Sequence, residues 1–151
     1  MKSTESGKQV QLHIPSGATL NSLMVNDINF VNAPITTSNS LDLGNNANIT
    51  FTSPPVGNTL YWIGGGGNWA DSQHWSTTSG GTASSGCIPS AVDHVIFDAN
   101  SGFTPGNNKV IIPQGHSFCK NMTWQGAPEN PIIDGTGDSP GFVKGTLNIF
   151  G

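Results

Sequence analysis

Residues able to do acid–base or metal chemistry are few in this chain and stand far apart. Its only local cluster of carboxylates is Asp71, Asp93 and Asp98, the type of group that a glycosidase would use. A lyase acting on an acidic polysaccharide would also need a basic residue, and the chain has five lysines and no arginine. The histidines, which lack the spacing of zinc ligands, are His13, His74, His94 and His116. We therefore predict a protein without enzymatic activity.

Oxygen-bearing side chains gather once, in the segment from Asp93 to Asn100. Asp93, Asp98 and Asn100 offer the carboxylate and amide oxygens that Ca²⁺ prefers, although their spacing is not that of an EF-hand loop. Aspartate also forms turns by accepting hydrogen bonds from its own backbone, which is the simpler interpretation. Calcium is thus the one cofactor that the sequence suggests, as an alternative to plain turns.

The most distinctive stretch runs from Tyr61 to Ser76. Four consecutive glycines predict a tight turn or a close approach of backbone segments, since glycine loses the most chain entropy on folding. Tryptophans seven and six residues apart fit neither a helix nor an alternating strand, so we expect large rings that close over a compact loop. The residues of this structural motif are Trp62, Gly64, Gly65, Gly66, Gly67, Trp69 and Trp75. The alternative is an aromatic platform for a sugar, with Trp69, Trp75 and Trp124 as candidates.

Composition argues against two kinds of partner. Only 9% of the 151 residues are charged, against about 25% in an average protein, and the formal net charge is −4. Nucleic acid is not an expected partner, because phosphate contacts require lysine and arginine. No apolar run approaches the length of a membrane span, so no membrane insertion is expected. Residues 1–8 lack the apolar core of a signal peptide and are expected to be a flexible lead-in.

Short β-strands must position these residues. Apolar pieces of about three to five residues recur along the chain, separated by turns rich in Asn, Gly, Ser and Thr. No segment keeps the period of an amphipathic helix, and prolines interrupt most attempts. The pattern predicts an all-β protein.

An internal repeat is visible at an offset of ninety-eight residues. Ile14-Pro15-Ser16-Gly17 matches Ile112-Pro113-Gln114-Gly115, and Met24 answers Met122 at the same offset. With a gap of one residue, the match extends to Pro34-Ile35 and Pro131-Ile132. The sequence therefore predicts part of a tandem array, in which neighbouring repeats of the same chain are the first partners.

Two architectures fit a repeat of this length. An immunoglobulin-like β-sandwich needs about seven strands in about 100 residues. A right-handed β-solenoid, similar to a parallel β-helix, stacks short strands in successive turns and buries each turn against the next. Short strands and polar corners favour the solenoid, with the sandwich as the alternative. The expected division is a lead-in at 1–8, the C-terminal part of one β repeat at 9–58, and most of the following repeat at 59–151.

One motif in the second half resembles a known class of repeats. It reads Trp62-Ile63-Gly64-Gly65, then Asn68-Trp69-Ala70-Asp71 and His74-Trp75-Ser76, followed by Pro89 and Asp93-His94-Val95-Ile96-Phe97-Asp98. This pattern resembles repeats of very large surface adhesins of gliding Bacteroidota, which the type IX system secretes, and of autotransporter passengers. The likeness covers residues 60–151 and, more weakly, 10–51.

The resemblance implies a secreted, cell-surface protein that serves in cell adhesion or gliding motility and has a β-helix architecture. We expect a non-catalytic structural or adhesive repeat. The alternative is a carbohydrate-binding module whose surface tryptophans bind a polysaccharide. An extracellular location favours a disulfide bond between Cys87 and Cys119, with two buried free thiols or a metal pair as alternatives.

Overall fold

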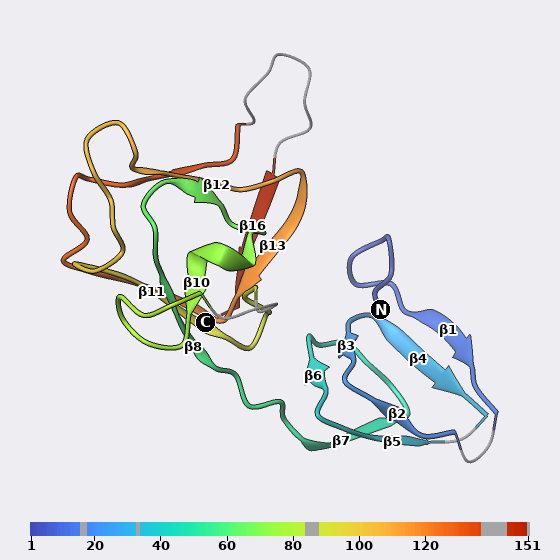
Figure 1. The fold of residues 1–151 in the computed structure, drawn as a ribbon. Helices are drawn as coiled ribbons and strands as arrows, with labels where there is room; N and C mark the ends of the chain where they lie inside the picture. Colours follow the sequence, from blue (N-terminus) through green and yellow to red (C-terminus); the bar gives the residue numbers. More distant parts are fainter. Residues whose placement is uncertain (16–17, 33, 84–87, 137–144, 151) are drawn as a thin grey trace. The chain divides into compact units, whose positions relative to one another are not determined.

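The computed structural model describes residues 1–15, 18–32, 34–83, 88–136 and 145–150, and it is all-β (Figure 1). The chain divides into two compact units, an N-terminal unit of residues 1–56 and a C-terminal unit of residues 57–151. No helix in the described part of the chain is long and apolar enough to cross a membrane. Each unit has its own hydrophobic core and is described by itself.

The N-terminal unit is built from parallel strands that pair across successive traverses of the chain. Its strands are β1 (Val10–His13), β2 (Leu20–Asn21), β3 (Met24–Val25), β4 (Ile28–Val31), β5 (Ile35–Ser38), β6 (Leu41–Asp42) and β7 (Ile49–Ser53). The strands form three parallel sheets, whose orders are β1-β4, β2-β5-β7 and β3-β6. One traverse through these sheets, here called a pass, takes seventeen or eighteen residues between β1 and β6.

Paired corner residues connect these passes. Ser22 and Asn39 have φ values of 56° and 50°, and Asp27 and Asn45 have φ values of 57° and 50°. Asn and Asp tolerate this left-handed backbone better than other non-glycine residues. The Asn39 amide donates a 3.0 Å hydrogen bond to the Ser22 hydroxyl, and the Asn45 amide donates one of 2.6 Å to the buried Asp27 carboxylate. The same corner is therefore repeated in consecutive passes.

The start of the chain belongs to this unit. Lys2 forms a parallel bridge with Asn26, and the amide of the buried Ser3 donates a hydrogen bond of 3.3 Å to the Asn26 carbonyl. The first three residues of the expected lead-in at 1–8 thus pair with the rest of the unit, and the flexibility of that segment stays a prediction. Backbone pairing at a distant site, which the local sequence does not reveal, holds them.

The C-terminal unit has the same parallel pattern with longer connections. Its elements are β8 (Thr59–Trp62), β9 (Gly67–Asn68), the 3₁₀ turn η1 (Ser72–His74), β10 (Trp75–Ser76), β11 (His94–Asp98), β12 (Lys109–Ile111), β13 (Gly115–Cys119), β14 (Asn121–Gln125), β15 (Ile132–Asp134) and β16 (Gly145–Ile149). The parallel sets are β8-β11-β14, β9-β12-β15 and β13-β16. The first pass holds β8 and β9, the middle pass β11 to β13, and the last pass β14 to β16.

Antiparallel pairing is the exception in the described strands. β10 pairs antiparallel with β8, on the side opposite β11. An immunoglobulin-like sandwich consists of antiparallel sheets, so the alternative architecture considered from the sequence does not fit this pairing. Short strands and polar corners favoured the solenoid in the sequence, but strand direction, which excludes the sandwich, depends on pairing between distant segments.

The ninety-eight-residue repeat corresponds to equivalent strands over part of its length. Leu12 lies in β1 and Val110 in β12, and Met24 and Met122 lie two strands further on, in β3 and β14. The match then loses its structural equivalence. Ile35 lies on β5, which pairs with β2, whereas Ile132 lies on β15, which pairs with β12.

Candidate functional site

The three tryptophans of the glycine-rich motif lie inside the C-terminal unit. Trp62, Trp69 and Trp75 are at most 1% exposed. The ring of Trp75 meets Trp62 edge to face, with centroids 5.0 Å apart, and meets Trp69 in the same way at 4.9 Å. Such contacts add to the free energy that burial of the rings already contributes. The motif therefore forms the centre of a packed aromatic cluster.

Hydrogen bonds from two of these rings fix the backbone of the corner. The indole nitrogen of Trp62 donates to the Gly65 carbonyl at 2.6 Å, and that of Trp75 donates to the Trp69 carbonyl at 2.8 Å. The indole nitrogen of Trp69 is buried and has no hydrogen-bond partner in the described part of the chain. The rings thus determine the path of the loop as well as filling its interior.

Close approach of other groups explains the glycines. The His74 ring stacks on Trp62 with centroids 4.6 Å apart and planes 6° from parallel, and its Nδ1 donates to the Ile63 carbonyl at 2.8 Å. A Cβ atom on Gly67 would overlap the other edge of this ring. A Cβ atom on Gly65 would lie 2.5 Å from the Asn107 amide nitrogen, and the Gly66 amide donates to the Asn107 side-chain oxygen at 3.1 Å. The glycine run therefore makes room for His74 and Asn107.

A sugar platform that includes Trp69 and Trp75 does not agree with this packing. Both rings are buried within the aromatic cluster and offer no face to a ligand. Of the three tryptophans considered for this role, Trp124 alone is exposed, at 43%. Only Trp124 remains a candidate for carbohydrate stacking.

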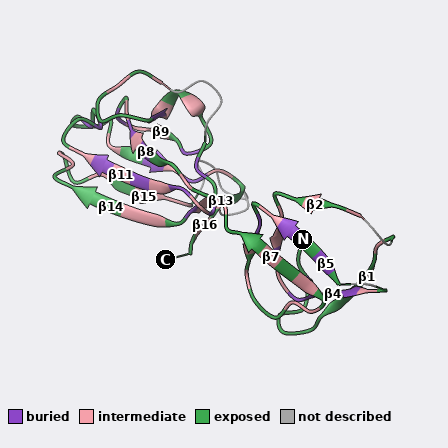
Figure 2. Cartoon of the chain, turned by 90° about the horizontal axis from the view of Figure 1, so that it is seen from below, coloured by how far each residue is buried: buried purple, intermediate pink, exposed green. Residues whose placement is uncertain are grey.

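Trp124 is also the last ring of a ladder that crosses three strands. In the parallel register Phe97 of β11 faces Trp124 of β14, and the two rings stack with centroids 4.2 Å apart and planes 13° from parallel. On the other side Phe97 packs against Trp62 of β8, with centroids 5.7 Å apart. In Figure 2 β11 alternates between buried and intermediate residues, whereas the C-terminal end of β14 is exposed. The ladder is therefore closed at Trp62 and open at Trp124.

The proposed calcium ligands are engaged as turn formers. One Asp93 oxygen accepts the Asn58 amide at 2.7 Å, and the other accepts the Ser90 amide at 2.8 Å and the Ser90 hydroxyl at 2.5 Å. An Asp98 oxygen accepts the Asn100 amide at 2.9 Å. The geometry favours the interpretation of these aspartates as turns. No group of three or more His, Cys, Asp or Glu residues that could hold a metal occurs among the described residues.

The histidines are not brought together. His94 contacts the Asn121 amide at 2.9 Å, and His13 contacts the Asn32 amide at 3.4 Å, each across a pair of neighbouring strands or their ends. His116 lies near Phe118 at a ring distance of 6.2 Å.

A pocket of about 330 Å³ in the N-terminal unit holds no ionisable side chain among its described lining residues, which are Phe30, Val31, Asn32, Pro34 and Asn48. These arrangements provide no acid–base pair.

One of the two cysteines can be placed. Cys119 is buried on β13, and burial raises the pKa of its thiol to about 11. Cys87 lies outside the described residues. The disulfide expected between them therefore stays a prediction.

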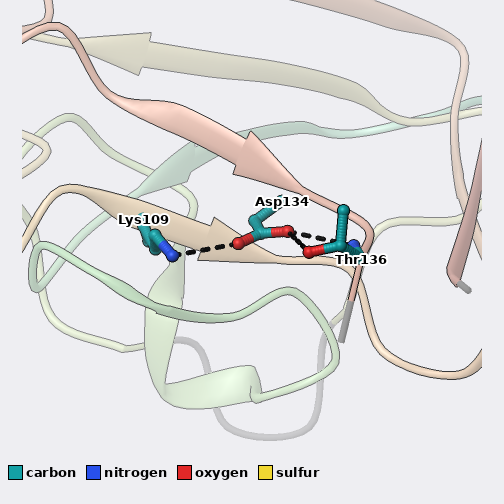
Figure 3. A network of polar contacts seen from close by, with 3 residues as sticks. All are labelled: Lys109, Asp134 and Thr136. Carbon is teal, nitrogen blue, oxygen red and sulfur yellow. Dashed lines mark hydrogen bonds and ion pairs between the residues drawn. The ribbon is translucent and has the colours of Figure 1, made fainter. Parts of the chain in front are cut away.

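A polar contact between β12 and β15 was not expected from the sequence. Asp134 accepts hydrogen bonds from the Thr136 hydroxyl at 2.5 Å and the Thr136 amide at 2.9 Å, and it pairs with the Lys109 ammonium at 3.1 Å (Figure 3). The Thr136 hydrogen bonds, followed by the Lys109 contact, lower the pKa of the Asp134 carboxyl from 3.8 to about 2. Lys109 and Asp134 are far apart in sequence, so only the spacing of the passes could have revealed this pair.

The described side chains therefore form a packed aromatic corner, a ladder that ends at Trp124, and carboxylates that close turns. Comparison with protein-family models, with curated proteins and with solved structures finds no match to this chain.

Proposed function

We propose that this chain is a non-catalytic structural or adhesive repeat of a large secreted cell-surface adhesin, and that each unit is a short right-handed β-solenoid. The parallel, in-register pairing of successive passes in both units carries the proposal. Stacked corner pairs such as Asp27–Asn45 and the ladder of Trp62, Phe97 and Trp124 are typical of a solenoid, in which each turn packs on the next. Parallel crossovers are right-handed in nearly all proteins, which supports the hand.

A structural role suits the chemistry of the chain. Asp93 and Asp98 use their oxygens to close turns, and the tryptophan motif is occupied by its own packing. The proposal needs no cofactor. Attachment or gliding motility would then depend on how such repeats space and present the parent protein on the cell surface.

Adhesion can be measured with beads that carry the chain, flowed over surfaces coated with a panel of polysaccharides. An adhesive repeat retains the beads, and a repeat that only spaces does not retain them but withstands force in single-molecule stretching. Unfolding of residues 57–151 in such stretching releases a segment with a total contour length of about 340 Å. Degradation of any polysaccharide by the purified chain would contradict the non-catalytic proposal.

Carbohydrate binding is the second candidate, and the exposed ring of Trp124 favours it. Exposed aromatic rings can stack on apolar faces of a sugar while their edges stay in water. Under this alternative, Trp124→Ala abolishes retention of the beads, whereas Tyr61→Ala, on another strand of the same sheet, preserves it. Equal retention by both variants would exclude Trp124 as the binding residue.

The proposed secreted location favours a disulfide between Cys87 and Cys119, because the extracellular environment is oxidising. A bond closing this loop would stabilise the unit by about 3–4 kcal/mol through the entropy of the unfolded chain. Thiol titration of the unreduced, denatured protein checks it: no reactive thiol is expected. Two reactive thiols in protein exposed to air would contradict both the bond and the oxidising location.

A further inference from the structure

The pocket of the N-terminal unit lies where two neighbouring parallel strands begin. Its volume is about 330 Å³, and its described lining residues are Phe30, Val31, Asn32, Pro34 and Asn48. Pro34 comes directly before β5, and Asn48 comes directly before β7. Because Ile35 of β5 pairs with Ile49 of β7, Pro34 and Asn48 are neighbours. Small-molecule sites in proteins usually have volumes of about 300–1,000 Å³ and combine apolar walls with a few polar groups, so this pocket has the size of a site for one small ring.

Two exposed side-chain amides supply the polar groups of this pocket. The Asn48 amide nitrogen donates a hydrogen bond of 2.9 Å to the Asn29 side-chain oxygen, which fixes the orientation of the Asn48 amide. The Asn32 amide nitrogen lies 3.4 Å from a ring nitrogen of His13. Among the described residues, no hydrogen bond occupies the side-chain oxygen of Asn32 or of Asn48. The pocket therefore offers two acceptors, and each amide has a second N–H group to donate.

The lining favours a ligand that is neutral and carries hydroxyl groups. None of the described lining residues is charged, so a phosphate or carboxylate group would lose its hydration there without gaining an ion partner. Phe30 is 0% exposed and offers no ring face on which a nucleic-acid base could stack. Side-chain amides donate and accept hydrogen bonds at the same time, as neighbouring hydroxyl groups of a sugar do. The exposed ring of Pro34 adds an apolar surface for the C–H groups of a sugar.

The surface next to the pocket has the same polar, uncharged character. Side chains two positions apart in a strand lie on the same face, so Thr36 follows Pro34 on this face. Thr50 follows Asn48 in the same way on the next strand. Thr36 pairs with Thr50 in the parallel register, and both are exposed. A saccharide chain with one ring in the pocket could thus continue along these hydroxyl groups.

We propose that this pocket binds one ring of a neutral saccharide through the side-chain amides of Asn32 and Asn48. The inference rests on the proposed adhesive role and names the ligand for it, a neutral polysaccharide on the surface to which the parent protein attaches. The site is distinct from Trp124, which belongs to the C-terminal unit.

Nuclear magnetic resonance of the isotope-labelled whole chain, titrated with oligosaccharides, tests the site. The probes are neutral oligosaccharides of glucose, galactose, mannose and N-acetylglucosamine, and an oligosaccharide of glucuronic acid is the charged comparison. At least one neutral probe is expected to shift the side-chain amide signals of Asn32 and Asn48. The same probe should leave tryptophan fluorescence unchanged, because all four tryptophans lie in the C-terminal unit. The glucuronic acid probe should bind more weakly, since the described lining provides no cation.

Glycine variants remove each amide without straining the backbone. Asn32 and Asn48 have φ values of 92° and 58°, which glycine adopts freely. Asn32→Gly and Asn48→Gly should each raise the dissociation constant of the neutral probe about fivefold or more, as expected for the loss of a hydrogen bond. Asn39→Gly is the matched control, because Asn39 is an exposed asparagine of the same unit with a φ of 50° and is not among the described lining residues. This control should bind the probe like the wild type.

Three results would overturn the saccharide pocket. They are the absence of any shift in these amide signals with all four neutral probes, tighter binding of the glucuronic acid probe, and an equal loss of affinity in Asn39→Gly and Asn48→Gly. A shift of the Trp124 indole signal in place of the amide signals would likewise move the site to the other unit.

Bead retention separates this inference from the adhesive role on which it rests. If beads that carry Asn48→Gly are retained on a polysaccharide as well as wild-type beads, adhesion stands and the pocket is not its contact. If the wild type binds a free neutral probe but its beads are not retained, the pocket stands and the adhesive role fails.

Discussion

At the scale of single residues, the four tryptophans fall into two groups with different surroundings. Trp69 is 1% exposed and packs edge to face on Trp75, whereas Trp124 stacks on Phe97 with one face open to solvent. We expect Trp69→Ala to lower the free energy of unfolding by about 3–5 kcal/mol, because it leaves a large cavity. Trp124→Ala should cost clearly less. Denaturant unfolding measures both, and equal losses would contradict the assignment of Trp69 to the core.

Gly67 and His74 are predicted to be coupled. A methyl group on Gly67 would displace the His74 ring, which is held by Trp62 and by its hydrogen bond to Ile63. Gly67→Ala should therefore destabilise the unit by about 2 kcal/mol. In a His74→Ala background the same change should cost less than about 1 kcal/mol, because the overlapping ring is gone. Additive losses in the double variant would show that His74 is not the reason for the glycine.

At the scale of elements, the corners of the N-terminal unit hold successive passes together. Asn45 combines a left-handed backbone with a hydrogen bond to the buried Asp27, so Asn45→Ala should cost about 2–3 kcal/mol. Asn45→Gly should restore about 1 kcal/mol, since glycine adopts this backbone freely. Asn39→Ala is the matched control, because its amide donates to the exposed Ser22 hydroxyl and not to a buried carboxylate. Denaturant titration followed by far-UV circular dichroism compares the three, and equal losses would contradict a special role of the buried carboxylate.

The contact of β15 with β12 predicts a dependence of stability on pH. The pKa of Asp134 is lowered from 3.8 to about 2 in the folded chain, so the folded state favours the charged carboxylate. Its contribution is present above pH 3.8 and is lost as the pH falls through about 2. Asp134→Asn should flatten the fall in stability over this range, as measured by denaturant unfolding at successive pH values. Lys109→Met should retain most of the fall, because the hydrogen bonds from Thr136 are the larger cause.

At the scale of the whole molecule, the two units differ in the size of their cores. Among the described residues, the C-terminal unit buries ten hydrophobic residues in one cluster and the N-terminal unit buries four. All four tryptophans lie in the C-terminal unit, so tryptophan fluorescence reports that unit alone. We expect residues 57–151 expressed alone to show the same fluorescence melting transition as the whole chain.

Residues 1–56 expressed alone should be marginal, because so short a chain buries a small fraction of its surface. Circular dichroism of the two fragments measures this difference. An unfolded 57–151 fragment would contradict the independence of its core.

The sequence by itself determined the local structure and showed that residues able to do acid–base or metal chemistry are few. Short apolar pieces between turn-forming residues specify strands, and the absence of a helical period excludes helices over most of the chain. The glycine run indicated a close approach of groups, and its neighbours turned out to be His74 and Asn107. The sequence did not reveal that Asp93 would use both its oxygens on Asn58 and Ser90, because those contacts depend on the folded path of the loop.

Tertiary structure alone decided which strands pair and which aromatic rings are covered. Gly67 pairs with Val110 across forty-three residues, but Val110 pairs with Ile133 across only twenty-three, so no constant period marks the passes in the sequence. Long connections between passes cost little additional entropy, and therefore their length is free to vary. Phe97 and Trp124 have similar hydrophobicity, yet one is fully buried and the other is 43% exposed. The difference arises because β11 has a partner strand on each side, whereas β14 has a partner strand on one side only. Only the order of the described strands in the folded sheet determines how many partners each strand has.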